Sequence, residues 1–284
     1  MKQSAKGTGI WTVLAIPVMI WTIIPLLFMG SLSLKSAETL ADPEANVLGN
    51  FFPKDPTFEN YELIFTGGAS DLFTPALRNS IIVCLLATLI SVVLAMFRAY
   101  AISRLEFAGK RLILTTALAV SFFPVIAMVT PLFDVWRRIG LFDTIPGLVI
   151  PYLALTLPLS IWTMSAFFQA IPWEMEQAAQ VDGASSWQAF RKVIVPLAAP
   201  GVFTTAIITF FTAWNDFVFS ISLTSDRART VPAALAFFTG ASQFEQPTGA
   251  IMAAAVVVTI PVVILVLVFQ RRIVAGLTSG AVKG

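Results

Sequence analysis

The chain has 284 residues, of which 57% are hydrophobic and 12% are charged, roughly half the charged share of a soluble domain. This composition and a mean hydropathy of +0.84 exclude an ordinary soluble protein and predict an all-α integral membrane protein. The net charge of +2 gives no support to a nucleic-acid partner. A chain with one cysteine and no histidine lacks a disulfide and the usual metal ligands, so we expect no metal site.

Six apolar runs have about the 20 residues that a helix needs to cross a bilayer. They cover residues 10–32, 81–97, 112–133, 145–168, 197–223 and 250–269. The first run is longer than the core of a signal peptide and no small-x-small cleavage site follows it, so we expect it to be retained. The sequence therefore predicts a single transmembrane domain over residues 1–284, with six transmembrane helices and no room for an ATPase domain.

Lysines and arginines are shared unequally between the loops. In the predicted topology, 11 of the 18 lysines and arginines lie on one side of the membrane. They are Lys2, Lys6, Arg98, Arg104, Lys110, Arg111, Arg191, Lys192, Arg271, Arg272 and Lys283. Four acids lie on that side, so its charge is 11 − 4 = +7, against 7 − 12 = −5 on the other. The positive-inside rule makes the basic side cytoplasmic, and both termini face it.

Prolines interrupt the later spans, at Pro124, Pro131, Pro151, Pro158, Pro200 and Pro261. Each one frees a backbone carbonyl that lipid cannot satisfy. We therefore expect kinked helices, either because they line a cavity or because they pack on their neighbours; the residues leave both alternatives open.

A polar segment, residues 172–196, separates the fourth and fifth runs. Pro172 suits the first turn of a helix, and Gly183 can adopt the left-handed conformation that ends one. Ser185 and Gln188 have the spacing of a capping box, which predicts a second helix. That helix carries Trp187, Phe190 and Ile194 on one face, and we expect Pro196 to end it.

The polar segment has two possible roles. Ala178 and Ala179 add little bulk to its first helix, so another protein surface can approach closely and dock. An amphipathic linker that lies on the lipid headgroups is the alternative, and the residues alone do not decide between them.

The spacing of this segment resembles the EAA loop of permease subunits in binding-protein-dependent ABC importers. That pattern is Glu-Ala-Ala, three residues, Gly, nine residues, then Ile-x-Leu-Pro. Gln177-Ala178-Ala179, Gly183 and Val193-Ile194-Val195-Pro196 occupy these positions, with Gln177 replacing Glu and valines replacing Ile and Leu. The resemblance implies a cytoplasmic two-helix coupling loop that docks on an ATPase subunit. The docking residues that it implies are Glu176, Gln177, Ala178, Ala179, Asp182, Gly183, Trp187, Phe190 and Pro196.

Trp214, Asn215 and Asp216 lie in the fifth run, where Asp216 is roughly 28 Å from the cytoplasmic end at 1.5 Å per residue. An aromatic ring beside hydrogen-bonding groups suits a sugar, and a carboxylate at this depth is a candidate functional residue. The alternative is an interfacial aromatic anchor with a capping aspartate. The three residues followed by Phe217 are similar to a motif of carbohydrate-type permease subunits, which makes them the candidate substrate path.

The last residues, Leu277 to Gly284, are mostly small, and their composition alone indicates a frayed end. They also resemble the Leu-Thr-x-Gly-x-Val-Lys-Gly tail of maltose-type permease subunits, which in that family reaches between the two ATPase subunits. The resemblance assigns this ATPase-interface role to Thr278, Gly280, Lys283 and Gly284.

Most of the chain, from the second span to the end, resembles one permease subunit of a maltose-type ABC importer for a di- or oligosaccharide. The implied partners are a second permease subunit, two ATPase subunits, an extracytoplasmic sugar-binding protein and lipid, in the inner or cell membrane of a bacterium or archaeon. We expect a non-catalytic chain without a cofactor, while the ATPase subunits hold ATP and magnesium.

Two alternatives remain. One is an ABC importer for another solute, such as phosphate, amino acids or peptides. The other is an ion-coupled secondary transporter, for which the sequence offers few intramembrane ionisable residues and no clear inverted repeat.

Overall fold

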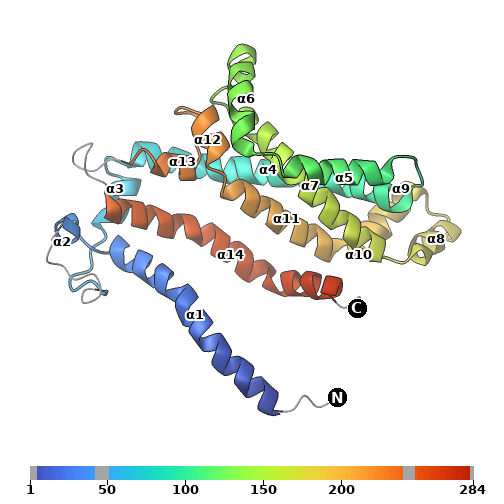
Figure 1. The fold of residues 1–284 in the computed structure, drawn as a ribbon, viewed down its shortest axis with the longest axis horizontal. Helices are drawn as coiled ribbons and strands as arrows, with labels where there is room; N and C mark the ends of the chain where they lie inside the picture. The colour runs from blue at the N-terminus through green and yellow to red at the C-terminus, as the bar shows by residue number, and fades with distance from the viewer. Residues whose placement is uncertain (1–4, 42–50, 239–246, 282–284) are drawn as a thin grey trace. The chain divides into compact units, whose positions relative to one another are not determined.

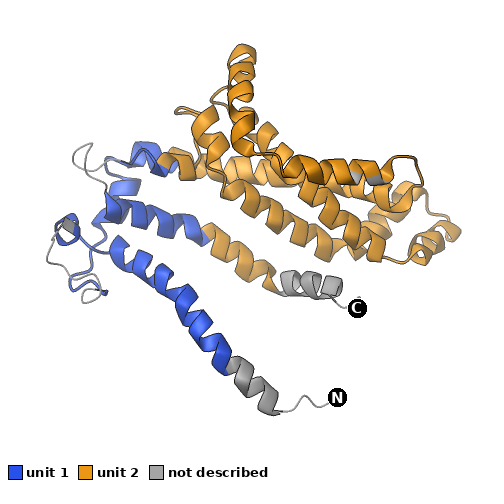
Figure 2. Cartoon of the chain, in the orientation of Figure 1, with its two compact units in different colours: residues 1–74, 235–260 blue, residues 75–234, 261–284 orange. Residues whose placement is uncertain are grey.

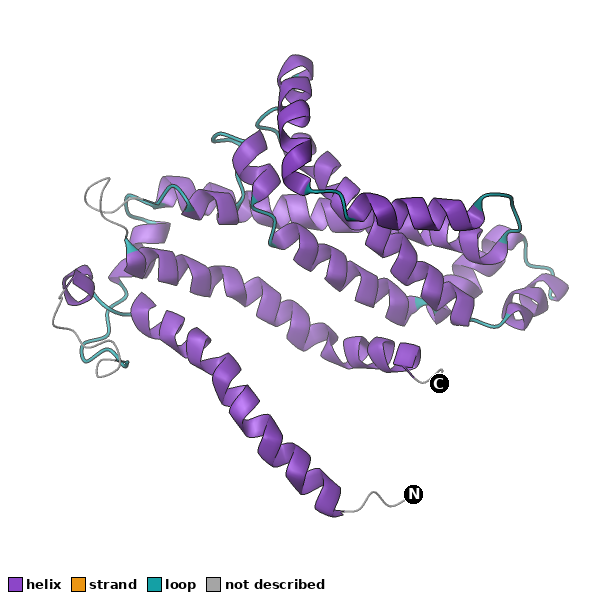
Figure 3. Cartoon of the chain, in the orientation of Figure 1, coloured by secondary structure: helices purple, strands orange, loops and turns teal. Residues whose placement is uncertain are grey.

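The computed structural model describes residues 5–41, 51–238 and 247–281. Every regular element in these ranges is helical (Figure 3), which confirms the predicted all-α class. Within them, four helices are long and apolar enough to cross a membrane, or six if two bent helix pairs each count as one span. The four are α1 (Ala5–Ser33), α4 (Ser70–Arg104), α7 (Ile145–Ala170) and α14 (Thr248–Ala281).

The chain divides into two compact units, coloured separately in Figure 2. Unit 1 comprises residues 1–74 and 235–260, and unit 2 comprises residues 75–234 and 261–284. The single domain that we expected stays a prediction, and each unit is described by itself. Two helices, α4 and α14, continue from one unit into the other.

Unit 1 contains α1, α2 (Ala37–Ala41), α3 (Glu59–Phe65) and the beginnings of α4 and α14. The buried side chain of Asn60 in α3 donates hydrogen bonds to the carbonyls of Ser33, at 3.0 Å, and Lys35, at 2.7 Å. The bond to Ser33 satisfies a carbonyl at the end of α1, which has no partner within its own helix, and the bond to Lys35 holds the turn that follows. Asn60 therefore fixes α3 to the end of α1.

Unit 2 holds most of α4, all of α7 and the shorter helices. These are α5 (Lys110–Ser121), α6 (Val125–Ile139), α8 (Trp173–Val181), α9 (Ser186–Ala189), the π-helix η1 (Phe190–Ile194), α10 (Val195–Leu197), α11 (Ala199–Trp214), α12 (Val218–Leu223) and, except for its last residue, α13 (Val231–Leu235). The central helix is α7, which packs against α5, α11 and α12 (Figure 1).

Buried hydroxyl groups join α7 to its neighbours. Ser91 of α4 and Thr156 of α7 are 2.6 Å apart, and Ser160 of α7 and Thr209 of α11 are 2.8 Å apart, measured between hydroxyl oxygens. Interhelical hydrogen bonds of this kind are typical of membrane bundles, because lipid offers no partner to a polar group. They hold α4, α7 and α11 together in unit 2, which also contains the polar segment.

The prolines have different effects in different spans. The predicted third span is a bent pair, in which α5 and α6 meet at 87° and α6 begins after Pro124. Pro151 and Pro158 lie inside α7, which continues through them. The predicted fifth span is also interrupted, because α11 ends at Trp214 and α12 starts at Val218.

Candidate functional site

The first helix of the polar segment forms where its sequence predicts. α8 begins directly after Pro172 and ends near Gly183, which has a φ of +89°. The N–H of Gly183 donates to the Gln180 carbonyl at 3.0 Å, and the N–H of Ala184 donates to the Ala179 carbonyl at 2.9 Å. This pair of bonds closes the helix in a Schellman motif, which needs a left-handed residue. The predicted turn at Gly183 is confirmed.

The second helix starts with the predicted capping box. The Ser185 hydroxyl accepts from the Gln188 N–H at 3.3 Å, and the Gln188 side chain accepts from the Ser185 N–H at 2.9 Å. These reciprocal bonds satisfy backbone donors that have no partner inside α9.

The second helix ends at Leu197, one residue after Pro196, so the predicted end is correct to within one residue. The chain continues from α9 through η1 into α10, where Pro196 lies in the first turn. Pro196 has no N–H to donate to the turn before it, so regular helical hydrogen bonding stops close to this residue. The wider π turn, closed by a bond from the Val195 N–H to the Phe190 carbonyl, leads into that position. The helix bends by 71° only beyond Leu197, where α11 begins.

The inner face of η1 packs into unit 2. Phe190 is 5% exposed and Ile194 is 0% exposed. Both belong to one hydrophobic cluster formed with α4, with α7 and with the residue after α10. The other members of the cluster are Ala95, Ala99, Ile102, Ile161, Met164, Phe168 and Ala198. Phe190 was expected to be a docking residue, but burial within its own chain removes it from the surface and makes it an anchor.

Aromatic rings extend this anchor toward the surface. The Tyr100 ring meets Phe190 edge to face with centroids 4.7 Å apart, and Trp187 stacks on Phe190 at 5.4 Å and on Phe97 at 6.1 Å. Trp187 remains 55% exposed. It therefore connects the buried cluster to the outer face of α9.

Glu176 is also buried, contrary to its expected place on a docking surface. Its Oε2 lies 3.4 Å from Nε of Arg104, with 3% of the arginine side chain and 4% of the glutamate side chain exposed. The Tyr100 hydroxyl donates to Oε1 of the same carboxylate. A carboxylate can be buried here because a guanidinium and a hydroxyl replace water. Glu176 thus fixes α8 to the end of α4.

The outer face of α8 and the turn after it stay accessible. Ala179 is partly covered, and the exposed residues are Trp173, Glu174, Met175, Gln177, Ala178, Gln180, Val181, Asp182 and Gly183. Val181 is 87% exposed, the largest exposed fraction among the large hydrophobic residues of this loop. Pro196 is exposed as well. Seven of the nine predicted docking residues (Gln177, Ala178, Ala179, Asp182, Gly183, Trp187 and Pro196) therefore remain at least partly accessible.

The candidate substrate-path residues end α11 and differ in exposure. Trp214 is 5% exposed and stacks on Phe210 with centroids 5.2 Å apart. Asn215 is exposed, and its side-chain amide donates to the Phe211 carbonyl at 2.9 Å. Asp216 accepts from the Ser220 N–H at 3.2 Å, so it caps α12. This hydrogen bond favours the alternative in which Asp216 is a capping aspartate. Of the three candidate substrate-path residues, Asn215 is the exposed one.

The predicted ATPase-interface tail is described only in part. The backbone of Thr278 and Gly280 lies in α14, which extends to Ala281 instead of fraying. Lys283 and Gly284 lie outside the described residues. The role of the tail stays a prediction.

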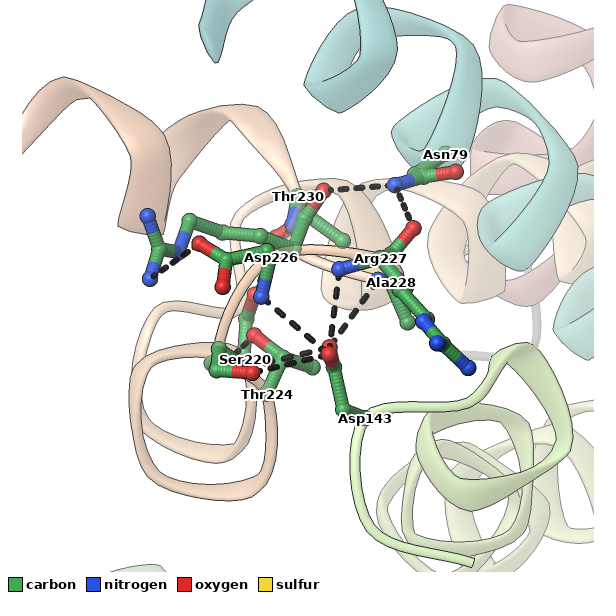
Figure 4. Close-up of polar contacts among 10 residues, drawn as sticks. Asn79, Asp143, Ser220, Thr224, Asp226, Arg227, Ala228 and Thr230 are labelled. Atoms are coloured by element: carbon green, nitrogen blue, oxygen red, sulfur yellow. Dashed lines mark hydrogen bonds and ion pairs between the residues drawn. The ribbon is translucent and has the colours of Figure 1, made fainter.

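Sequence reasoning missed Asp143, which lies in the turn between α6 and α7 with a φ of +56°. Its carboxylate accepts hydrogen bonds from four successive backbone N–H groups of residues 225–228, at 3.0 to 3.2 Å, and from the Ser225 hydroxyl at 2.8 Å (Figure 4). Burial acts to raise the pKa of Asp143, but these hydrogen bonds outweigh it and lower the pKa to about 2. No sequence signal marks this aspartate, because its partners lie 82 to 85 positions away.

Other buried side chains hold the same stretch of backbone. The Asn79 amide donates to the carbonyls of Arg227, at 2.8 Å, and Arg229, at 3.1 Å. The Ser80 hydroxyl accepts from the Val231 N–H at 2.8 Å, and the Ser220 hydroxyl accepts from the Thr230 N–H at 3.0 Å. Residues 225–231, which we call the pinned segment, are therefore fixed by α4, α12 and the turn before α7.

Comparison with known proteins places this arrangement in a family. Residues 87–279 match the model of the binding-protein-dependent transport system inner membrane component. The chain belongs to this family. The permease is thus a multi-pass membrane subunit of a binding-protein-dependent importer, as its sequence motifs predicted, and the alternative of a secondary transporter is not favoured.

Two relatives match the permease over most of its length. It is 54% identical to the trehalose transport system permease protein SugB of Mycobacterium tuberculosis (strain CDC 1551 / Oshkosh), over 99% of this chain and 100% of that protein. It is 43% identical to the trehalose/maltose transport system permease protein MalG of Thermococcus litoralis, over 82% of this chain and 88% of that protein.

A solved structure has the same fold. A chain of a bacterial ABC transporter involved in the import of the acidic polysaccharide alginate superposes on the permease with a TM-score of 0.75, covering 95% of this chain and 98% of that one. The two are 22% identical. The likeness confirms that the helices follow an ABC-transporter fold.

Proposed function

We propose that this permease imports a disaccharide or oligosaccharide of the trehalose or maltose type, delivered by an extracytoplasmic binding protein. The observation that carries the proposal is the 54% identity with a trehalose permease over 99% of the chain. At this identity, with no large insertion or loss, the residues that line a translocation path are expected to be largely shared. The relatives named for trehalose and maltose favour a sugar over phosphate, amino acids or peptides.

Import is driven by two separate ATPase subunits, which bind ATP and magnesium, and this chain pairs with a second permease subunit. The chain contributes no catalytic group. Its coupling loop, residues 172–196, docks on one ATPase subunit through the outer face of α8 and the turn at Gly183. Exposed Val181 and Met175 beside the small Ala178 support this role, because apolar side chains around a small residue allow close approach.

The orientation of the permease follows from its charges. The coupling loop and both termini face the cytoplasm, where the ATPase subunits are. The pinned segment then faces the binding protein on the opposite side. The carboxy-terminal residues from Thr278 onward reach the interface of the ATPase subunits.

Reconstitution tests the transported solute. The permease, its partner permease, the ATPase subunits and the binding protein are placed in proteoliposomes, and ATP-dependent uptake of labelled trehalose, maltose, phosphate and an amino acid is measured. We expect uptake of one or both sugars and none of phosphate or the amino acid. Uptake of a non-sugar alone would contradict the proposal.

Co-purification tests the docking surface. Val181→Asp places a charge on the exposed apolar face of α8, so we expect the permease to lose the ATPase subunits while it still inserts and pairs with its partner permease. The matched control is Phe58→Asp, which places the same charge at an exposed apolar position at the start of α3, outside the candidate membrane spans. Equal retention of the ATPase subunits by Val181→Asp and the parent would refute docking at this face.

A further inference from the structure

The last two turns of α4 carry one stripe of residues that contacts the coupling loop. Phe97, Tyr100 and Arg104 are spaced at i, i+3 and i+7, which places them on one face of a helix. Phe97 and Tyr100 contact the aromatic rings of α9 and η1, and Arg104 contacts α8. Both helices of the coupling loop are therefore attached to the same face of the same membrane helix.

Arg104 makes three different contacts with α8 and the residues before it. Its Nε lies 3.4 Å from the Glu176 carboxylate, and its Nη2 donates to the Ile171 carbonyl at 2.9 Å. Its guanidinium also lies over the Trp173 ring, 4.9 Å from the centroid. A planar guanidinium that is bound along its edge and on its face has one orientation, which a lysine cannot reproduce.

Burial makes this attachment stiff. The Arg104 and Glu176 side chains are only 3% and 4% exposed, and separating them would leave two buried charges without an opposite charge nearby. Breaking a buried pair in this way is far more costly than breaking an ion pair on the surface. We therefore expect α8 and the end of α4 to move together and not to slide past each other.

We propose that Arg104 is a positioning residue, which locks α8 to α4 so that movement of a docked ATPase subunit reaches α4 as a rigid displacement. This proposal rests on the proposed docking of the coupling loop. Docking requires only the outer face of α8, whereas transmission requires its inner attachment. The two roles therefore fall on different residues and can be lost separately.

The test replaces the ion pair by a covalent link. Arg104→Cys and Glu176→Cys are combined in a Cys84→Ser background, and the complex is assayed before and after treatment with a short bifunctional thiol reagent. We expect the untreated variant to bind the ATPase subunits but to lose stimulation of ATP hydrolysis by trehalose-loaded binding protein, on the order of 10-fold, within the range of typical coupling energies. The cross-link should restore the stimulation, because the link and not the charge is required.

The matched control is the ion pair of Glu106, which is exposed, and Lys110, which is partly buried; their charged atoms lie 3.7 Å apart on the same predicted side of the membrane. Glu106→Cys with Lys110→Cys should leave stimulation at the parent level with and without the reagent. A second variant, Arg104→Lys, keeps the buried charge but not the guanidinium contacts, and we expect stimulation between that of the parent and that of the untreated double variant.

The outcomes separate this proposal from the proposed function. Parent-level stimulation in Arg104→Lys and in the untreated double-cysteine variant would overturn the positioning role and leave docking intact. Loss of assembly that the cross-link does not restore would also overturn it, because Arg104 would then serve folding. Failure of docking itself would appear as unchanged ATPase binding in Val181→Asp, whatever the Arg104 variants do.

Discussion

Asp143 and Ser225 are 82 positions apart and are joined by two hydrogen bonds, from the Ser225 N–H at 3.0 Å and from its hydroxyl at 2.8 Å. The same carboxylate accepts the next three backbone N–H groups, so one side chain satisfies a whole turn of the pinned segment. Successive N–H groups that converge on one oxygen pair form an anion-binding nest. Here the anion belongs to the chain itself, which makes Asp143 the main support of this turn.

Asp143→Asn should loosen the pinned segment. An amide keeps one acceptor oxygen and tolerates a positive φ, but its NH₂ group faces backbone donors, so we expect a loss of about 1–3 kcal/mol in local stability. Hydrogen exchange of residues 225–228 should rise, while exchange in α8 should not change. Equal protection of residues 225–228 in variant and parent would show that the carboxylate does not hold them.

Asp143 also predicts a pH dependence. Because its pKa falls from 3.8 to about 2 on folding, its contribution is complete above about pH 4 and is lost as the pH falls through about 2. The carboxyl group is partly exposed, so solvent screening limits this contribution to roughly 1 kcal/mol. The difference in melting temperature between the parent and Asp143→Asn should therefore shrink below about pH 4. A difference that stays constant from neutral pH to about pH 2.5 would contradict this role.

Gly183→Val should uncouple the permease. No atom lies within 4 Å of a Cβ built at Gly183, so the cost comes from its φ of +89° alone, about 1 kcal/mol or more. A changed turn would move α8 relative to α9, and we expect weaker ATPase binding or weaker stimulation of ATP hydrolysis, measured in one preparation. Gly183→Asn, which tolerates a positive φ, should retain more of both.

Gly140 supplies the control for Gly183. It has a φ of +76° and is equally free of neighbouring atoms, but it ends α6 and lies outside the coupling loop. Gly140→Val carries a similar backbone strain and should leave ATPase binding unchanged. If both valine variants lose ATPase binding equally, strain at any turn would explain the result and the coupling loop would lose its special role.

Asn215→Ala should impair sugar uptake without loss of assembly. The side chain is exposed, and the hydrogen bond that it makes among the described residues goes to its own helix, so its removal costs little stability. Loss of a hydrogen bond to the sugar would weaken uptake by about 10-fold. Transport kinetics with labelled trehalose measure this. Unchanged kinetics would show that Asn215 only ends a helix. Trp214→Ala is not a suitable variant for this test, because the buried Trp214 ring supports the core.

Thiol labelling tests the orientation. In a Cys84→Ser background, single cysteines at Ala45 and Ser242 should react with an impermeant reagent from outside, and one at Ser186 only after permeabilisation. Ala45 and Ser242 lie outside the described residues, so Asp226, which is exposed, supplies a further outer position. Labelling of position 186 in intact cells would reverse the orientation and remove the coupling loop from the ATPase side.

The sequence by itself determined what depends on neighbours along the chain. Composition and apolar run length fixed the all-helical membrane class, because the bilayer demands about 20 apolar residues in a hydrogen-bonded helix. The turn at Gly183 and the capping box at Ser185 were predicted because φ preference and capping involve residues at most a few positions apart. The two helices of the coupling loop and the turn between them were predicted for the same reason.

The tertiary structure decided what depends on remote partners. From the sequence, Glu176 is expected to be a surface charge. In the structure it is buried, because α4 places Arg104 and Tyr100, which is 76 positions away, against its carboxylate. Phe190 similarly becomes an anchor only because α4 and α7 enclose it. Burial and pairing are properties of the space between helices, and a run of residues does not specify which helix will fill that space.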